Sequence, residues 1–413
     1  MRLPSRSASR CGMFQVRPRG MPLRRRDFLR ASAILAASAG SSLWAKAALA
    51  SGRIVAGPSP LGPLRPADEN GLMLPAGMRS RVVARSGEKV PGSDYVWHRD
   101  PDGGAIFGAE RGFVYVSNSE SNSHGGVGAI RFADDASIQD AYPICNGTRA
   151  NCAGGSTPWQ TWLSCEEFPA GHVWECDPLG RRKARLRNAL GTFKHEAVAV
   201  DSVNRYLYLT EDESDGRLYR FTPARWGELV EGLLEVAEVA PNDVLSWHRV
   251  PNPNPRIPSE TPTRHQVAQS TPFRGGEGII HQQGHVYFTT KYDNRVWDYD
   301  TASGRLRVLY DAALDPGRQL TGVDNAAPTP GGDVLVAEDG GNMELVLLSA
   351  AGVAAPLLRL TGQSDSELTG PAFDPSGTRL YFSSQRGGRS GITYEVTDSE
   401  RRFGANAPTG RPT

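Results

Sequence analysis

The sequence lacks the features that mark several classes of protein. Its formal net charge is only +1 over 413 residues, so composition gives no case for nucleic acid as a partner. The histidines do not form a metal-binding pattern such as His-Glu-x-x-His, and neither a Gly-x-Ser-x-Gly elbow nor a phosphate-binding loop is present. Hydrolysis by an activated serine is therefore disfavoured.

Long apolar runs are scarce. The Ala-rich run from Ala31 to Trp44 is shorter than the ~20 residues that span a bilayer, and nothing later approaches that length. It follows Arg25-Arg26-Asp27-Phe28-Leu29-Arg30, which resembles the twin-arginine export motif, and it precedes small-residue cleavage candidates. We therefore expect residues 1–50 to be a signal peptide that is removed after recognition by the twin-arginine export machinery. The mature protein should be periplasmic or secreted, without a stable membrane span.

Cysteine is also scarce. Of the five cysteines, Cys11 lies in the predicted signal peptide, and Cys145, Cys152, Cys165 and Cys176 remain. Cys145 and Cys152 flank a turn-rich loop that could close a disulfide in an oxidising compartment, although the sequence leaves the pairing open. Cys165 differs, because two carboxylates follow it directly.

Glycine and proline, in contrast, are abundant, with 46 and 30 residues, and predict many turns and short strands. Six strand-like segments end in polar or charged residues and are centred on Tyr115, Trp162, Tyr208, Tyr287, Leu335 and Tyr381, at intervals of 47, 46, 79, 48 and 46 residues. A period of about 40–50 residues with several strands per unit is typical of propeller blades. The sequence therefore predicts an all-β, six-bladed β-propeller over residues 51–400, followed by a flexible tail over 401–413.

The long interval has a visible cause. Between residues 224 and 272 the sequence changes to a stretch that we expect to be helical, from Trp226 to Val239, and then to a Pro-rich stretch. We interpret this as an insertion between blades, because the repeat resumes afterwards with its earlier spacing. A split into two domains near Pro255 is the alternative, which the equal periodicity on both sides disfavours.

Acidic residues recur at corresponding positions of the repeat. In the later units a strand that starts with an acid turns tightly and pairs with a strand that ends with one, and both positions lie at the same edge of an antiparallel sheet. The acids at strand starts (Glu196, Glu277, Asp324) and at strand ends (Glu120, Glu166, Glu211, Glu338) should therefore converge around the propeller axis.

Such an acidic ring indicates bound cations, because clustered carboxylates cannot all stay ionised without countercharge. Carboxylate and carbonyl oxygens suit Ca²⁺. Cys165 among the acids would add a softer ligand, which points to a transition metal beside the calcium.

The residues also resemble a known family. The signal segment, the block 151–167 (NCAGGSTPWQTWLSCEE), the segment 194–201 (KHEAVAVD) and the late acidic segments are similar to the PhoX-type alkaline phosphatases, over about residues 70–395. The resemblance implies a six-bladed propeller that hydrolyses phosphate esters with Fe³⁺ and Ca²⁺. It implies metal-ligand roles for one cysteine and a set of carboxylates, here Cys165, Glu166, Glu196, Glu277, Asp324, Glu338 and Asp339.

The expected reaction is metal-assisted hydrolysis of a small phosphate ester by a monomer. Lys291 and Arg386, basic residues at strand ends, would bind the non-bridging oxygens of the phosphoryl group, and His195 would orient a ligand or move a proton. Two alternatives stay open: a calcium-dependent lactonase or esterase of the propeller type, and a non-catalytic binding propeller stabilised by metal.

Overall fold

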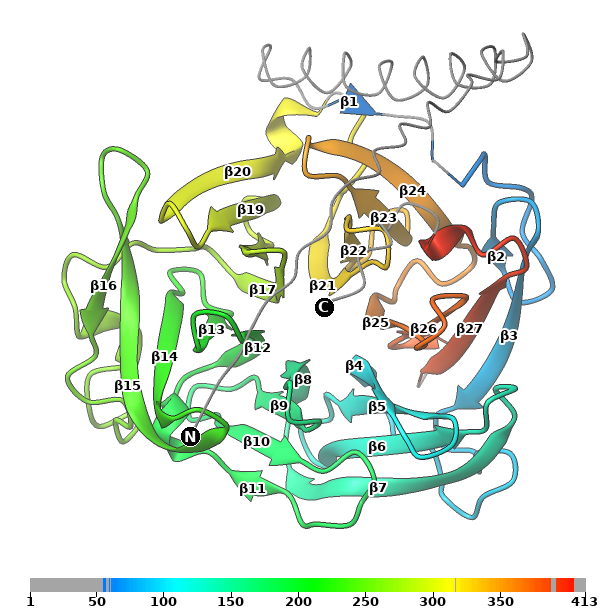
Figure 1. Ribbon diagram of the computed structural model, residues 1–413, viewed down its shortest axis with the longest axis horizontal. Coiled ribbons are helices and arrows are strands. Elements are labelled where there is room, and N and C mark those ends of the chain that lie inside the picture. Colours follow the sequence, from blue (N-terminus) through cyan, green and yellow to red (C-terminus); the bar gives the residue numbers. More distant parts are fainter. Residues whose placement is uncertain (1–54, 57–58, 60, 316, 388–390, 405–413) are drawn as a thin grey trace, which may run out of the picture. The chain divides into compact units, whose positions relative to one another are not determined.

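Six β-sheets stand around a central axis in the computed structural model of the chain (Figure 1). The structure describes residues 55–56, 59, 61–315, 317–387 and 391–404, which all belong to the unit Ala48–Thr413. The predicted signal peptide and most of the predicted tail lie outside the described residues. Each sheet is one blade, so the prediction of an all-β, six-bladed propeller is confirmed.

The first three blades follow one another along the chain. The first contains β4 (Pro101–Gly108), β5 (Phe113–Ser119), β6 (Gly125–Phe132) and β7 (Ile138–Thr148). The second contains β8 (Asn151–Ser156), β9 (Trp162–Glu166), β10 (Val173–Cys176) and β11 (Arg185–Leu186). The third has five strands: β12 (His195–Asp201), β13 (Tyr206–Glu211), β14 (Leu218–Arg225), β15 (Glu228–Val239) and β16 (Leu245–Arg249).

The last three blades complete the ring. The fourth contains β17 (Gly276–Gln282), β18 (His285–Thr290), β19 (Arg295–Asp300) and β20 (Arg305–Asp311). The fifth contains β21 (Val323–Pro328), β22 (Val334–Glu338), β23 (Glu344–Leu348) and β24 (Val353–Leu360), and both β1 (Val55–Ala56) and β2 (Leu72–Met73) pair with β24. The sixth contains β25 (Leu368–Phe373), β26 (Arg379–Ser384) and β27 (Ile392–Asp398), with β3 (Met78–Arg85) as its outermost strand. Because β3 precedes the first blade in sequence, its ladder with β27 closes the ring.

Short 3₁₀ turns connect some of these strands. They are η1 (Asn188–Leu190), η2 (Thr263–His265), η3 (Ala312–Leu314) and η5 (Arg402–Gly404). Among the described residues no helix is long and apolar enough to cross a membrane.

The hydrophobic core lies between neighbouring blades. The predicted central aromatic residues face these layers: the rings of Tyr115 and Tyr381 stack at 5.7 Å between the first and sixth blades. Tyr208 and Tyr299 meet edge to face at 5.9 Å between the third and fourth blades. Aromatic and β-branched side chains on both faces of each blade therefore hold the ring together.

The expected helix from Trp226 to Val239 is wrong. This stretch forms β15, which pairs with β14 through a tight turn at Trp226 and Gly227. Its Glu and Leu residues favour a helix locally, but the free edge of β14 offers a hydrogen-bond ladder, and Leu229, Leu234 and Val236 are buried against the blade. Only the chain between β16 and β17 remains an irregular insertion.

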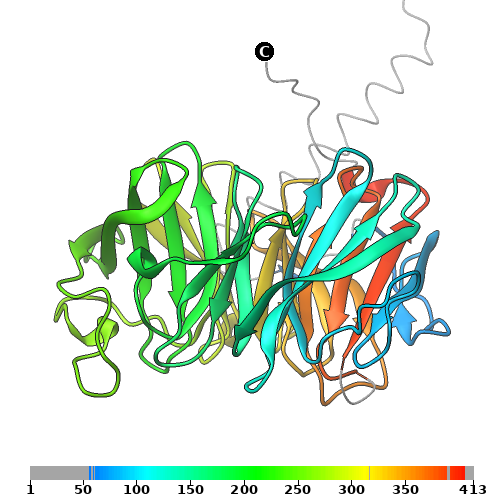
Figure 2. The same ribbon diagram turned by 90° about the horizontal axis from the view of Figure 1, so that it is seen from below.

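The first strand of each blade lines the axis, and Figure 2 shows the strands running along it. These inner strands (β4, β8, β12, β17, β21 and β25) approach one another closely, so small residues are needed. A Cβ on Gly155 of β8 would lie 1.8 Å from the carbonyl oxygen of Val198 in β12. Each inner strand is also interrupted near its start by a β-bulge, and bulges commonly redirect side chains next to functional sites.

Candidate metal centre

The bulges of the inner strands bring one ring of side chains to one end of the axis. In each blade the first residue of the inner strand pairs with the second strand, and in the sixth blade the second residue also does so before the bulge. The next residue begins the bulge, so its side chain no longer follows the regular alternation between the two faces of the sheet. These next residues are Asp102, Cys152, Glu196, Glu277, Asp324 and Gly370. We call this set the floor ring. Five of its six members carry a group that can bind a metal.

A second ring follows the ends of the second strands. In each blade, one residue of the second strand pairs with the inner-strand residue that precedes the bulge. The next residue along the chain lies at the same end of the axis. These following residues are Glu120, Glu167, Asp212, Lys291, Asp339 and Ser384. We call this set the rim ring. Four of its members are acids and one is a cation.

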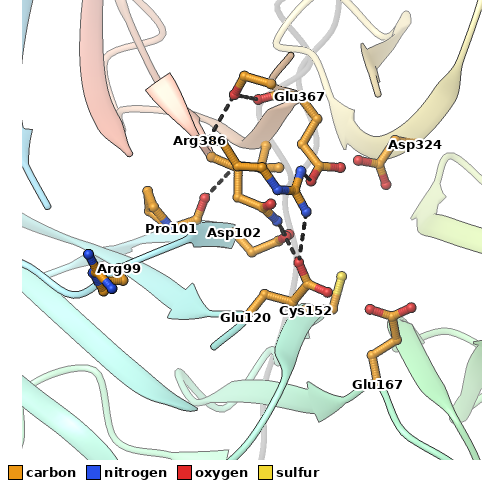
Figure 3. A network of polar contacts seen from close by, with 12 residues as sticks. Arg99, Pro101, Asp102, Glu120, Cys152, Glu167, Asp324, Glu367 and Arg386 are labelled. Carbon is orange, nitrogen blue, oxygen red and sulfur yellow. Dashed lines mark hydrogen bonds and ion pairs between the residues drawn. The ribbon is translucent and has the colours of Figure 1, made fainter. Parts of the chain in front are cut away.

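The two rings enclose a pocket of about 130 Å³, to which Val323, Glu367 and Arg386 also contribute. Three sets of side chains hold their ligand atoms within 4.8 Å of one another: Glu120, Cys152 and Glu167; Asp102, Glu120 and Glu367; Glu196, Glu277 and Asp324. Figure 3 shows Asp102, Glu120 and Glu367 converging beside Arg386, with the sulfur of Cys152 close to Glu120. A carboxylate-lined pocket of this kind has the donor chemistry of a multi-cation site.

The rest of the axial channel has a different lining. A cavity of about 450 Å³ follows the pocket, bounded by the next residues of the inner strands, such as Gly103, Ala153 and Gly278. No acidic side chain of the described residues lines it. The acidic groups are thus confined to one end of the axis.

Two lysines are held within the acidic cluster. The Nζ atom of Lys291 lies 2.8 Å from Asp212 Oδ2 and 2.6 Å from Glu277 Oε1. Lys194 binds the same Asp212 oxygen at 2.6 Å and Glu167 at 2.8 Å. Asp212 therefore positions both lysines at the rim of the pocket, although the ammonium of Lys291 still reaches solvent.

Arg386 brings a third cation from the sixth blade. Its guanidinium pairs with Glu367 and lies 3.7 Å from Glu120 Oε2. The adjacent Gln385 donates from Nε2 to Asp102 and, at 2.8 Å, to Glu120. Arg386 is half exposed whereas Gln385 is fully buried, so the arginine can meet a ligand and the glutamine fixes two acids.

Burial and mutual repulsion shift the acids strongly. Burial, followed by the charge of Glu167, raises the pKa of Glu120 to about 8. Burial, with further repulsion among the acids, raises the pKa of Asp102, Glu196 and Asp324 well above the ordinary range. The pocket is therefore an environment in which a cation would be strongly favoured.

The cysteine of the pocket is Cys152, which corrects the prediction for Cys165. Cys152 is the floor-ring residue of β8, and its thiol donates to Glu196 Oε1 at 3.2 Å. Cys165 is the next-to-last residue of β9 and packs in an apolar cluster with Leu163 and Val173. The regular alternation of β9 turns Cys165 away from the axis, whereas the bulge of β8 turns Cys152 toward it.

Two predicted carboxylates, Glu166 and Glu338, also lie outside the pocket. Each is the first of two consecutive acids, and the second one, Glu167 or Asp339, belongs to the rim ring. The carboxylate of Glu338 accepts the backbone N–H groups of Thr321 at 2.6 Å and of Glu344 at 2.9 Å. Glu166 likewise accepts backbone N–H groups, those of Arg149 at 3.3 Å and His172 at 3.2 Å. Glu211, the first acid of the pair with Asp212, accepts the N–H of Arg217 at 3.1 Å. The first acid of each pair thus fastens the loop at the end of its blade.

His195 does not reach the pocket either. It precedes the bulge of β12, its ring stacks on Phe193 at 3.5 Å, and Nε2 lies 3.1 Å from the carbonyl oxygen of Gly191. Burial lowers the pKa of His195 to about 3. The predicted role of His195 in proton movement is therefore not supported by its position.

The remaining predicted residues are brought together. Those that line the pocket are Glu120, Glu277, Asp324, Asp339, Lys291 and Arg386, and Glu196 lies beside them through its contacts with Cys152, Glu277 and Asp324. Sequence reasoning missed Asp102, Cys152, Glu167 and Glu367. A signal for two of these is present, because Asp102 and Cys152, like Glu196 and Glu277, are each followed by glycine or alanine near the start of an inner strand.

Fold and site together define a six-bladed propeller whose polar site is at one end of the central axis. The family described as Alkaline phosphatase PhoX matches the sequence over residues 125–169 and 168–307. The resemblance to PhoX-type alkaline phosphatases that the sequence motifs indicate is thereby confirmed. The matched residues include Cys152, Glu167, Glu196 and Glu277 of the two rings.

Solved structures show the same fold. The structure of Pseudomonas fluorescens PhoX in complex with vanadate, a transition state analogue, is 16% identical with a TM-score of 0.66, covering 82% of this chain and 98% of that one. A structural genomics protein of unknown function from Bacteroides thetaiotaomicron is 11% identical with a TM-score of 0.50, covering 77% of this chain and 76% of that one. No curated protein has a significant sequence match.

Proposed function

We propose that the protein is a metal-dependent phosphoester hydrolase whose active site is the pocket formed by the two rings. One observation carries the proposal: on a chain with PhoX-type sequence, the same small pocket is lined by members of three groups of side chains that could hold a metal and by two cations, Lys291 and Arg386, that reach solvent. The carboxylates suit metal ions, and the cations suit the oxygens of a phosphoryl group.

The residues present fit the metals that the family resemblance implies. Glu196 Oε2 is buried and has no hydrogen-bond partner among the described residues, as expected of a ligand atom. Glu196, Glu277 and Asp324 offer only oxygen and suit Ca²⁺, whereas Glu120, Cys152 and Glu167 add a thiol and suit Fe³⁺. When bound, these ions would neutralise the charge that develops on the phosphoryl oxygens.

The side chains of this chain then bind and orient the substrate. Arg386, at the rim and half exposed, can donate two parallel hydrogen bonds to non-bridging oxygens. Lys291 supplies a second positive charge from the fourth blade, and its contact with Asp212 limits its rotamers before substrate arrives. Gln385 keeps Asp102 and Glu120 facing the pocket.

We further propose that the protein acts outside the cytoplasm. The support is the twin-arginine-like segment at Arg25 and Arg26, which precedes an apolar run of export-signal length. Export of an already folded chain would allow the metals to be bound before translocation.

Turnover of p-nitrophenyl phosphate by purified protein tests the phosphatase proposal. Protein loaded with iron and calcium should hydrolyse the ester, and Arg386→Gln should raise KM at least tenfold. Arg379→Gln is a matched control, because Arg379 lies at the other end of β26 and pairs with Glu395. Absence of turnover in protein whose metal content is verified by elemental analysis would refute the proposal.

The same purified protein also distinguishes the two alternative functions, a calcium-dependent lactonase and a non-catalytic binding propeller. A calcium-dependent lactonase would contain calcium without iron and would open a lactone while leaving the phosphate ester intact. A binding propeller would contain metal and turn over neither substrate.

A further inference from the structure

Two buried cysteines lie together at the boundary of the first two blades. Cys145 is in β7, the outer strand of the first blade, and Cys176 ends β10 in the second blade. Both belong to one apolar cluster that includes Ile144 and Trp162, and they are only 4% and 0% exposed. Each thiol also shifts the pKa of the other: Cys176 lowers the pKa of Cys145, and Cys145 raises the pKa of Cys176.

Packing on both sides of the pair fixes this contact. The hydroxyl of Tyr142, in the same strand as Cys145, donates to the carbonyl oxygen of Pro178 at 3.1 Å, just beyond Cys176. Gly180, with φ of +65°, passes so close to the ring of Tyr142 that an added Cβ would lie 3.2 Å from two ring carbons. β7 and the turn after β10 are therefore held against each other independently of the cysteines.

The other two described cysteines have different surroundings. Cys152 faces the acidic pocket and donates to Glu196, and Cys165 is enclosed in a separate apolar cluster. The predicted pairing of Cys145 with Cys152 is thus not favoured by the structure, in which all four thiols are free.

We propose that Cys145 and Cys176 form a disulfide bond that joins the first two blades. The oxidant would be a disulfide, either of a thiol–disulfide oxidoreductase or of a small molecule such as oxidised glutathione. The Cys145 thiolate attacks one sulfur of that disulfide and releases one thiol. The Cys176 thiolate then attacks the mixed disulfide and releases the second. Two protein thiols are oxidised, and one external disulfide is reduced to two thiols.

The local chemistry suits this order. The neighbouring Cys176 thiol lowers the pKa of Cys145, which favours the attacking thiolate. Cys145 is followed by the exposed Asn146 and Gly147 at the end of β7, so a small local opening there gives an oxidant access.

The bond would act on the candidate metal centre through the backbone. The chain leads from Cys145 directly into β8 and Cys152, and the cluster Glu120, Cys152 and Glu167 is built from these same two blades. A link between β7 and β10 fixes one blade against the other. It also removes Cys145 as a competing partner for Cys152.

Differential alkylation and peptide mapping test the proposal. Full-length chain is incubated with oxidised glutathione, denatured without reductant, alkylated and digested. We expect a linked peptide that contains Cys145 and Cys176, while Cys152 and Cys165 are alkylated. Alkylation of both Cys145 and Cys176, or a peptide linking Cys145 to Cys152, would overturn the proposal.

Thermal unfolding gives a second readout. A reductant should lower the Tm of the oxidised wild-type protein by several degrees and leave the Tm of the Cys145→Ala/Cys176→Ala double variant unchanged. Cys165→Ala is the matched control and should keep the reductant effect. An equal reductant effect in the double variant would contradict the assigned pair.

Discussion

The consecutive acids at the end of β22 allow a sharp test of how the site is built. Glu338 is fully buried and accepts the N–H groups of Thr321 and Glu344, whereas Asp339 is exposed at the pocket. Glu338→Ala leaves the buried N–H of Glu344 without an acceptor and also removes a bond to the more exposed Thr321, so we expect the free energy of unfolding to fall by about 1–3 kcal/mol. Asp339→Asn breaks no such bond and should change it by less than about 0.5 kcal/mol.

Urea denaturation of metal-free protein measures the free energy of unfolding of both variants. Calorimetric titration with Ca²⁺ measures their calcium binding. Asp339→Asn should weaken calcium binding, while Glu338→Ala, assayed where it is folded, should keep the wild-type stoichiometry. Glu338→Gln retains an acceptor and should be intermediate in stability. The reasoning fails if Asp339→Asn destabilises the fold as much as Glu338→Ala, or if only Glu338→Ala loses calcium.

Three further predictions concern other residues. Burial lowers the pKa of His98 to about 3, so between pH 6.5 and 3 the unfolded chain binds a proton that the folded one does not, and stability falls with falling pH by about 1.4 kcal/mol per unit. In His98→Gln this contribution to the pH dependence of the free energy of unfolding should be absent, as measured by urea denaturation at several pH values. Cys152→Ser should lower the amount of bound iron with little change in stability. Cys165→Ser should keep the metal and lower the free energy of unfolding by about 1–3 kcal/mol, because its hydroxyl enters an apolar cluster. Elemental analysis measures the metal content and urea denaturation measures the stability. Gly155→Ala should destabilise the protein by about 3 kcal/mol or more, seen as a lower Tm, since its Cβ would overlap a carbonyl oxygen of the third blade.

Much of the fold could be predicted from the sequence, because each blade repeats the same local pattern. The second strands centred on Tyr115, Tyr208 and Tyr381 recur with aromatic residues that must be buried between blades. The strand β15 could not be predicted, because the residues from 228 to 239 favour a helix locally. Their conformation is decided by the free edge of β14, which is a tertiary feature.

Part of the candidate site was predictable: the acids at the strand ends were identified to within one residue, whereas Asp102, Cys152 and Glu367 were missed. Glu196, Glu277 and Asp324 were found because they start inner strands, where the bulge turns them to the axis. At the strand ends the register decides the outcome: in an acid pair such as Glu166 and Glu167, one side chain faces the axis and the other the blade. The sequence alone does not tell which acid of a pair faces the axis. A shift of the strand register by one residue would exchange the two, so the pairing of the strands must be known first.

The sixth blade differs from the others, and this difference makes the two sides of the candidate site unlike in charge. Its floor-ring residue is Gly370, with φ of +59°, where a Cβ would lie 2.6 Å from the carbonyl oxygen of Asp102. No side chain can enter the ring there, and this blade instead contributes Glu367 and Arg386 from the loops around β25 and β26. The thiol of Cys152 lies in the second blade, while the solvent-accessible positive charges of Lys291 and Arg386 come from the fourth and sixth. An anionic substrate would therefore be drawn to the side of the ring formed by the fourth to sixth blades, where Lys291 and Arg386 reach solvent.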